Sequence, residues 1–275
     1  MEPPLPEPRE ESGAASTGGR LYVIGGLDPA GNSTATTFYF DGGWHSGPRL
    51  PLGLDHPGVA TVAGHIYVAG GFSGGRASAR FFRLDGEAWA ELAPMKRAAG
   101  ALALVSAGDS LYALAGLGTA EIDTPEVFDP AGSGWHDLPM QPKPRNHVSG
   151  FSYSGLACIA GGRGTRPIPA PNTAAVNCFD PKSTAWVGFA ALPFPTSGAG
   201  AGALGDQIIV AGGEDAQENR MVDQVARFRA GSWVTEKMLM PRHGFFLAPY
   251  QGRLWACGGG SDPGLHAVTT CTSIG

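Results

Sequence analysis

A six-residue motif, an apolar strand that ends in two glycines, recurs six times along the chain. Its copies occupy residues 21–26, 66–71, 111–116, 157–162, 208–213 and 254–259, with second glycines 45, 45, 46, 51 and 46 residues apart. Tryptophans keep the same period, at spacings of 45, 46, 51 and 47: Trp44, Trp89, Trp135, Trp186 and Trp233. The glycine motif and the tryptophans share one period of about 45–51 residues, and such a period predicts a stack of structural repeats.

Each repeat reads as four short strands, and the second repeat shows them best. Its apolar runs cover 59–62, 65–69, 79–84 and 88–92, with Asp85-Gly86 as a tight turn before the last. A four-stranded sheet has two faces to bury, and a closed ring of stacked sheets buries all of them. First strands rich in small residues, such as 199–203, suit the crowded axis of such a ring. The sequence therefore predicts an all-β fold, a six-bladed β-propeller of four-stranded antiparallel blades, over residues 13–275.

The sixth repeat ends without the tryptophan strand that follows the other five. Residues 1–12 form a separate segment rich in proline and acidic residues. We expect residues 2–5 to supply a short outermost strand to the sixth blade, because proline is tolerated at a sheet edge. The alternative is that the chain was cut from a longer parent that carried the missing strand.

The composition argues against several kinds of partner. The chain has 275 residues and a net charge of -5, without a basic cluster, which argues against binding to nucleic acid. The sequence contains neither a secretory signal nor an apolar stretch long enough to span a membrane. We therefore expect a cytoplasmic monomer that has no contact with membranes.

The combined pattern resembles the kelch repeat. That repeat has a strand ending in Gly-Gly, a Val-x-x-Phe/Tyr-Asp-Pro strand, a tryptophan and a Leu-Pro or Met-Pro-x-Arg linker. Here residues 176–181 followed by Trp186 carry the middle of the pattern, and Met240-Pro241-Arg242 carries the linker. The third repeat departs from it with Ala115 in place of the first glycine. The resemblance covers nearly the whole chain and implies a stand-alone, bacterial-type protein similar to the galactose oxidase and kelch propellers.

Kelch propellers similar to this chain are mostly protein-interaction domains, and a minority are enzymes. The resemblance therefore implies a binding module that uses one loop-rich face to recognise a protein, a peptide or an anionic ligand. The alternative is a small-molecule enzyme with its site on that face: a carbohydrate mutarotase or isomerase, resembling the kelch-type sialic acid mutarotases, or a biosynthetic tailoring enzyme. The sequence leaves open whether the protein is an enzyme, and we expect no cofactor.

The binding face should hold the loops that enter the first strands and those that join the second and third strands. Both emerge on the same side of an antiparallel blade. Arg145 and Arg242 precede first strands at matching places, with His147 and His243 beside them. These arginines either brace the linkers between blades or form an anion-accepting rim at the mouth of the central channel.

Charged loops of the fourth and fifth blades complete the predicted site. The loop over 162–174 is the main source of the longest repeat interval, and extra loop length commonly adds binding function. The predicted ligand-binding residues are Arg145, His147, Arg163, Glu214, Arg242 and His243. If the protein is an enzyme, Glu214 and His243 are the catalytic candidates, with Glu214 as acid/base and Arg163 or Arg242 holding an anionic group.

Three histidines, His56, His147 and His243, precede inner strands in alternate blades. We predict no metal site, because His243 is offset by one residue and such a shift turns a strand side chain to the other face. The four cysteines fall in two pairs on neighbouring strands, Cys158 with Cys178 and Cys257 with Cys271. The sequence leaves open whether these pairs are reduced or form disulfides.

Overall fold

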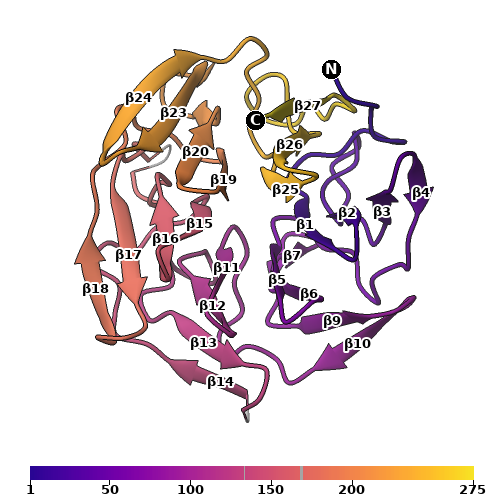
Figure 1. The fold of residues 1–275 in the computed structure, drawn as a ribbon, viewed down its shortest axis with the longest axis horizontal. Coiled ribbons are helices and arrows are strands. Elements are labelled where there is room, and N and C mark those ends of the chain that lie inside the picture. Colours follow the sequence, from indigo (N-terminus) through magenta and orange to yellow (C-terminus); the bar gives the residue numbers. More distant parts are fainter. Residues whose placement is uncertain (133, 168–169) are drawn as a thin grey trace.

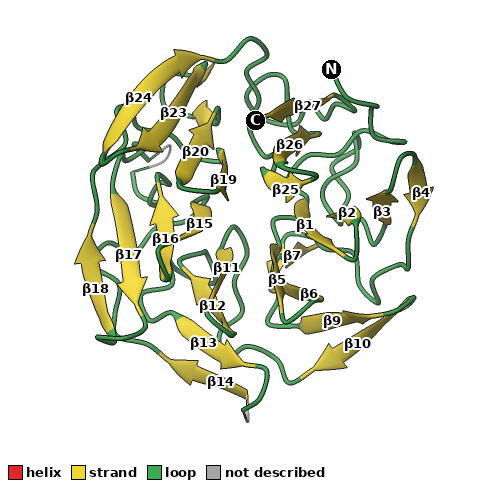
Figure 2. Cartoon of the chain, in the orientation of Figure 1, coloured by secondary structure: helices red, strands yellow, loops and turns green. Residues whose placement is uncertain are grey.

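The computed structural model describes residues 1–132, 134–167 and 170–275, and its regular elements are all β-strands (Figure 2). Six antiparallel sheets radiate from a central axis and close into a ring (Figure 1). The predicted six-bladed propeller is therefore confirmed. Because the described residues form no helix, that part of the chain has no helix able to cross a membrane.

The strands follow one another from the axis outwards within each blade. Blade one contains β1 (Gly13–Thr17), β2 (Arg20–Ile24), β3 (Thr37–Phe40) and β4 (Trp44–Ser46). Blade two contains β5 (Gly58–Val62), β6 (His65–Ala69), β9 (Phe81–Asp85) and β10 (Ala88–Leu92). Blade three contains β11 (Ala103–Ala107), β12 (Ser110–Leu114), β13 (Glu126–Asp129) and β14 (Gly134–Asp137).

The remaining blades continue the same order. Blade four contains β15 (Ser149–Tyr153), β16 (Leu156–Ala160), β17 (Val176–Asp180) and β18 (Ala185–Gly188). Blade five contains β19 (Gly200–Leu204), β20 (Gln207–Ala211), β23 (Gln224–Arg229) and β24 (Ser232–Lys237). Blade six contains β25 (Ala248–Tyr250), β26 (Arg253–Cys257) and β27 (Cys271–Ile274). Two small hairpins lie in loops of blades two and five: β7 (Phe72–Ser73) with β8 (Arg76–Ala77), and β21 (Glu214–Asp215) with β22 (Arg220–Met221).

The double glycines form the seam between neighbouring blades. In blade two, Gly70 and Gly71 have φ of 65° and 90°, and a Cβ on Gly70 would overlap the carbonyl oxygen of Ala99 in the next linker. The amide of Gly71 donates to that same carbonyl at 2.8 Å. The other five blades repeat this bond at 2.8–3.0 Å, from Gly26, Gly116, Gly162, Gly213 and Gly259 to Leu54, Arg145, Thr196, Arg242 and Arg9. The last of these bonds joins blade six to blade one and closes the ring.

The hydrophobic core is divided among the blade interfaces. In the described part of the chain, six buried apolar clusters each draw on two neighbouring blades, for example blades two and three around Phe81, Phe128 and Trp135. Burial of these faces drives the stacking, because a single blade has no other partner for them.

The periodic tryptophans fasten the outer strands to the preceding blade. Each indole lies opposite an apolar residue of the third strand in its own sheet, as Trp44 does opposite Phe40. Four indole nitrogens donate to carbonyls of the preceding linker at 2.8–3.0 Å: Trp44 to Pro3, Trp89 to Pro48, Trp186 to Pro139 and Trp233 to Ala190. Their shared period in the sequence therefore has one structural cause.

The two ends of the chain meet at blade six (Figure 1). The amide of Glu2 donates to the carbonyl of Cys271 at 3.0 Å, and the amide of Leu5 donates to Thr269 at 2.8 Å. Leu5 is buried in the cluster between blades six and one. Residues 2–5 thus run alongside residues 269–271, where β27 begins, and we propose that residues 1–12 act as the closing segment of the ring.

Both cysteine pairs form disulfides that join directly opposite residues of neighbouring strands. The Sγ atoms of Cys158 and Cys178 are 2.06 Å apart in blade four, and those of Cys257 and Cys271 are 2.00 Å apart in blade six. Blade six therefore holds its last strand by a covalent bond as well as by its hydrogen bonds.

Thiol titration in denaturant tests this pairing. Without reductant we expect no reactive thiol, and after reduction we expect four, because all four cysteines of the chain are paired. The double variant Cys158→Ala/Cys178→Ala should yield two thiols, and only after reduction. Four thiols in the unreduced wild-type protein would contradict the disulfides.

Candidate functional site

One residue of each blade, two positions before the innermost strand in blades one to five and four positions before it in blade six, contributes to a ring around the axis. We call these six residues the collar: Glu11, His56, Ala101, His147, Gly198 and Gly244. All six have a left-handed backbone, with φ between 50° and 62°. Each collar amide donates to the collar carbonyl of the preceding blade, and these N···O distances of 2.6–3.1 Å form a closed circle. The circle holds four non-glycine residues in a conformation that they would otherwise adopt rarely.

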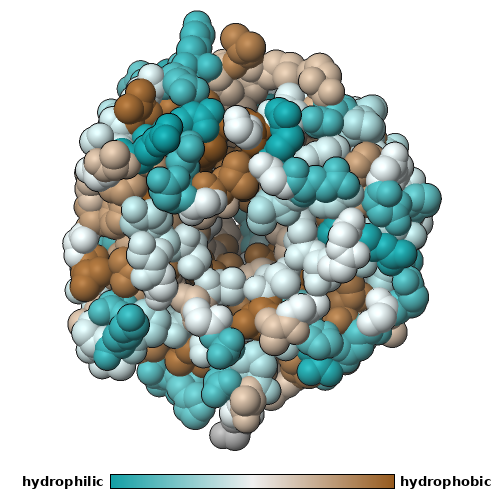
Figure 3. Space-filling view, viewed as in Figure 1, coloured by the Kyte–Doolittle hydropathy of each residue, from teal (hydrophilic) through white to brown (hydrophobic). Residues whose placement is uncertain are grey.

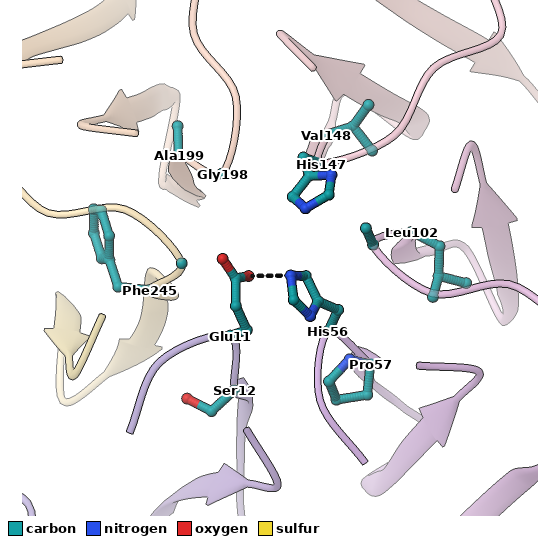
Figure 4. Close-up of a pocket in the computed structure, with 12 residues that line it drawn as sticks. Glu11, Ser12, His56, Pro57, Leu102, His147, Val148, Gly198, Ala199 and Phe245 are labelled. Atoms are coloured by element: carbon teal, nitrogen blue, oxygen red, sulfur yellow. Dashed lines mark ion pairs between the residues drawn. The ribbon is translucent and has the colours of Figure 1, made fainter. Parts of the chain in front are cut away.

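The collar surrounds a cavity of about 110 Å³ at one mouth of the channel (Figure 4). Figure 4 shows the Glu11 carboxylate and the rings of His56 and His147 converging on this space. Ala101, Gly198 and Gly244 add no polar side chain, so the polar groups of the collar come from Glu11, His56 and His147. The space-filling view shows that the ring is hollow at its centre, where the channel runs (Figure 3).

Glu11 and His56 form an ion pair inside the cavity. Glu11 Oε2 lies 3.3 Å from His56 Nε2, and His56 Nδ1 lies 2.6 Å from Asp55 Oδ1. Burial would lower the pKa of His56, but Glu11 and Asp55 outweigh it and raise that pKa above its usual range. Burial would likewise raise the pKa of Glu11, but the charge of His56 and the contacts of His243 hold it below its usual range. Each partner therefore favours the charged form of the other.

His147, by contrast, is neutral. Its ring lies edge-on to His56 with centroids 5.1 Å apart, and its Nδ1 lies 2.6 Å from Asn146 Oδ1. Burial and then the positive charge of Arg163 hold the pKa of His147 well below its usual range. Since the amide oxygen of Asn146 only accepts, Nδ1 carries the proton and Nε2 is a hydrogen-bond acceptor.

His243 lies one residue before the collar residue Gly244, whereas His56 and His147 are themselves collar residues; this is the one-residue offset seen in the sequence. Its Nδ1 lies 3.6 Å from Glu11 Oε1, and its Nε2 donates to the carbonyls of Asp262 and Gly264 at 3.1 and 3.0 Å. Burial would lower the pKa of His243, but the nearby carboxylate of Glu11, with those of Glu214 and Glu10, raises it to about 9. His243 is thus a buried cation beneath the carboxylate of Glu11.

Arg163 and Glu214 link blades four and five beside the collar. Arg163 Nη1 donates to Glu214 Oε1 at 2.7 Å and to Ser197 Oγ at 2.9 Å. The backbone of each residue pairs with the turn that precedes an inner strand, Arg163 with Asn146 and Glu214 with Ser197. Both charges are therefore fixed in position next to the channel mouth.

Arg145 and Arg242 lie in the blade interior, away from the collar cavity. Arg145 is 1% exposed and Arg242 is 2% exposed. Arg145 donates to the carbonyls of Gly161 and Lys143, and Arg242 to those of Gly258 and Thr270. Burial lowers the pKa of both guanidinium groups to about 10. This geometry fits arginines that brace the linkers between blades, which is one of the two roles that the sequence left open for them.

The predicted site residues therefore divide into two groups. The structure brings His147, Arg163, Glu214 and His243 together around the channel mouth, and it places Arg145 and Arg242 beneath them. Sequence reasoning missed Glu11, although a signal exists, because Glu11 occupies in blade one the place that His56 and His147 occupy in their blades. Within the described residues, no group of three His, Cys, Asp or Glu side chains is arranged to hold a metal ion.

The bracing role of Arg145 predicts a stability effect. Arg145→Met should lower the free energy of unfolding by about 2–4 kcal/mol, because it leaves buried carbonyls without their donor. Arg220→Met is a matched control with an exposed ion pair and should change the free energy by about 0–0.5 kcal/mol. Urea unfolding measures both. Equal effects of the two substitutions would contradict the bracing role.

The raised pKa of His243 predicts a dependence of stability on pH. A group whose pKa is higher in the folded state stabilises fully below its unfolded pKa of about 6.5 and loses this contribution as pH rises through about 9. Wild-type stability should therefore decrease between pH 6.5 and 9, and His243→Gln should flatten that decrease. Substitution of the exposed His136 by Gln should leave the decrease unchanged. Urea unfolding across this range provides the measurement.

Comparisons with known proteins agree with this architecture. The kelch motif matches residues 8–51 and 55–96. The chain is 26% identical to "Kelch repeat and BTB domain-containing protein 13" of Homo sapiens, over 68% of this chain and 42% of that protein. It is 28% identical to "Kelch-like protein terF" of Aspergillus terreus, over 92% of this chain and 61% of that protein. The chain thus spans about half the length of these curated relatives.

A solved structure entitled "Structure of YjhT" shares the fold. It superposes with a TM-score of 0.84 at 17% identity, and the match covers 99% of both chains. The sequence match identifies the first two repeats, and the structural match shows that the whole chain shares this fold. The chain is a six-bladed β-propeller whose first two repeats match the kelch motif.

Proposed function

We propose that this protein is a binding module that recognises a protein or peptide partner on the face formed by the collar. One observation carries the proposal: turns from six blades converge on this face and bring Glu11, His56, His147, Arg163 and Glu214 to one channel mouth. Binding residues commonly lie on loops that a rigid scaffold positions. Relatives that carry kelch repeats suggest the same general role.

The size of the cavity favours a partner that lies across the face. Sites for small molecules usually enclose about 300–1,000 Å³. The collar cavity, at about 110 Å³, can accept the tip of one inserted side chain. The comparisons give no support to the alternative of a mutarotase, isomerase or tailoring enzyme.

The polarity of the cavity indicates what that side chain offers. His147 Nε2 and the Glu11 carboxylate are acceptors, whereas His56 already uses both ring nitrogens on Glu11 and Asp55. An inserted donor, such as an amine, amide or hydroxyl group, would therefore meet two acceptors. Arg163 and Glu214 beside the collar would contact the flanking residues of the partner.

Site-specific photocrosslinking tests the proposal. A photoreactive residue at Thr119, on a loop of the proposed face, should capture a partner, whereas one at Ser183, on the opposite face, should not. For the captured partner, His147→Ala or Arg163→Ala should raise Kd by about 5- to 30-fold.

Lys182→Ala, in the turn on the opposite face, is the matched control and should change Kd by less than about twofold. Equal crosslinking from both faces, or equal effects of the three substitutions, would count against the proposed face. The cytoplasmic location and the monomeric state stay predictions. The thiol titration also tests the predicted location: because disulfides persist mainly in oxidising compartments, paired cysteines would argue against the cytoplasm.

A further inference from the structure

The channel continues beyond the collar into a second cavity. Its volume is about 280 Å³, and its lining residues come from the innermost part of all six blades. It shares no lining residue with the collar cavity, and none of the described residues that line it carries a charged side chain. Because the ring is hollow at its centre, a small molecule can reach this cavity along the axis (Figure 3).

The pairing register shows which lining residues stand at the same height in the ring. The first residue of each glycine motif pairs with one inner-strand residue, and these six partners are Ser16, Thr61, Ser106, Ser152, Ala203 and Pro249. Since the blades repeat around one axis, the six partners form one layer of the cavity wall. Blades one to four each contribute a hydroxyl-bearing residue to this layer, and we call these four residues the hydroxyl arc.

Two hydroxyl groups of the arc are available to a ligand. Ser106 and Ser152 are half-buried, and their hydroxyls form no hydrogen bond with another described residue. Their strands, β11 and β15, lie side by side in neighbouring blades (Figure 1). Thr61, by contrast, already donates to the carbonyl of Ser16 at 3.1 Å. A hydroxyl both donates and accepts, so Ser106 and Ser152 can together bind one polar group.

The remaining side chains of the wall are apolar. Two residues nearer the collar than the arc, the next layer consists of Ala14, Val59, Leu104, Gly150, Ala201 and Leu247. Ala203 and Pro249 extend this apolar surface in blades five and six. A charged ligand is disfavoured, since no side chain of the wall would compensate its buried charge.

We propose that this channel cavity binds an uncharged small molecule that carries one hydroxyl group on an apolar body. The hydroxyl group bonds with Ser106 and Ser152, and the apolar body lies against the layer that includes Leu104 and Leu247. An engineered apolar cavity of about 150 Å³ accepts benzene. A cavity of about 280 Å³ therefore has room for an aromatic ring and its substituent. The site is separate from the collar and does not depend on the function proposed there.

Four molecules with the same ring and different attached groups test this selectivity: benzyl alcohol, toluene, benzoate and benzylammonium. Titration at pH 7, followed by NMR of the backbone amides, should give saturable shifts with benzyl alcohol that are largest in β11 and β15. Benzoate and benzylammonium should bind at least about tenfold more weakly, because the wall offers no opposite charge. Toluene should bind about fivefold more weakly, because it lacks the hydroxyl group.

Variants of the protein locate the bound molecule. The double variant Ser106→Ala/Ser152→Ala should weaken benzyl alcohol binding about fivefold and leave toluene binding unchanged, because only the alcohol uses these hydroxyls. Ser183→Ala, which removes a hydroxyl from an exposed turn, is the matched control and should change neither. Ala203→Leu should weaken binding of both molecules at least about tenfold, because it fills the cavity. Circular dichroism checks that each variant is folded.

Three outcomes would overturn the proposal. One is the absence of saturable shifts when folded wild-type protein meets benzyl alcohol at up to about 20 mM, which would leave the cavity to water. Another is equal affinity for benzyl alcohol and benzoate. The third is benzyl alcohol binding that the double serine variant and Ala203→Leu both leave unchanged, which would place the molecule elsewhere on the protein.

Discussion

The fold depends on one backbone hydrogen bond that is repeated at every blade interface. The amide of the second glycine in each repeat donates to a carbonyl in the linker of the next blade. This carbonyl approaches so closely that a Cβ on Gly70 or Gly212 would overlap it. The double glycine therefore suits the contact between blades, and its regular recurrence follows from the ring, although blade three makes the same bond with Ala115 at the first position.

The same contact positions the channel mouth. The carbonyl that accepts the glycine amide stands two residues before the collar residue, so each blade fixes where its neighbour's collar residue lies. The second circle of hydrogen bonds, among the collar backbones, then holds Glu11, His56 and His147 with their side chains around one cavity. Their pKa values follow from this arrangement, because buried charges must be compensated by one another. Glu11 and His56 each favour the charged form of the other, and His147 is held neutral.

Much of the fold could be predicted because its determinants are local and periodic. The glycines at strand ends, the tryptophans of the outer strands and the small residues near the axis each report a repeated environment. The candidate site was predicted less completely. Arg145 and Arg242 occupy rim-like places in the sequence, yet their long side chains turn inward to donate to carbonyls of their own blades. Side-chain direction of this kind depends on which acceptors are near, and spacing along the chain does not encode it.

The sequence by itself determined the ring: six repeats, their strand order and the absence of the periodic outer-strand tryptophan after the sixth glycine pair. Tertiary structure decided which polar groups meet, because collar residues stand some 45 positions apart and become neighbours only when the ring closes. It paired Glu11 with His56 and His243, and it joined the cysteines in blades four and six. It also placed Met238, Leu239, Met240 and Ile274 around one groove between blades five and six, since such a surface forms only where two blades face one another.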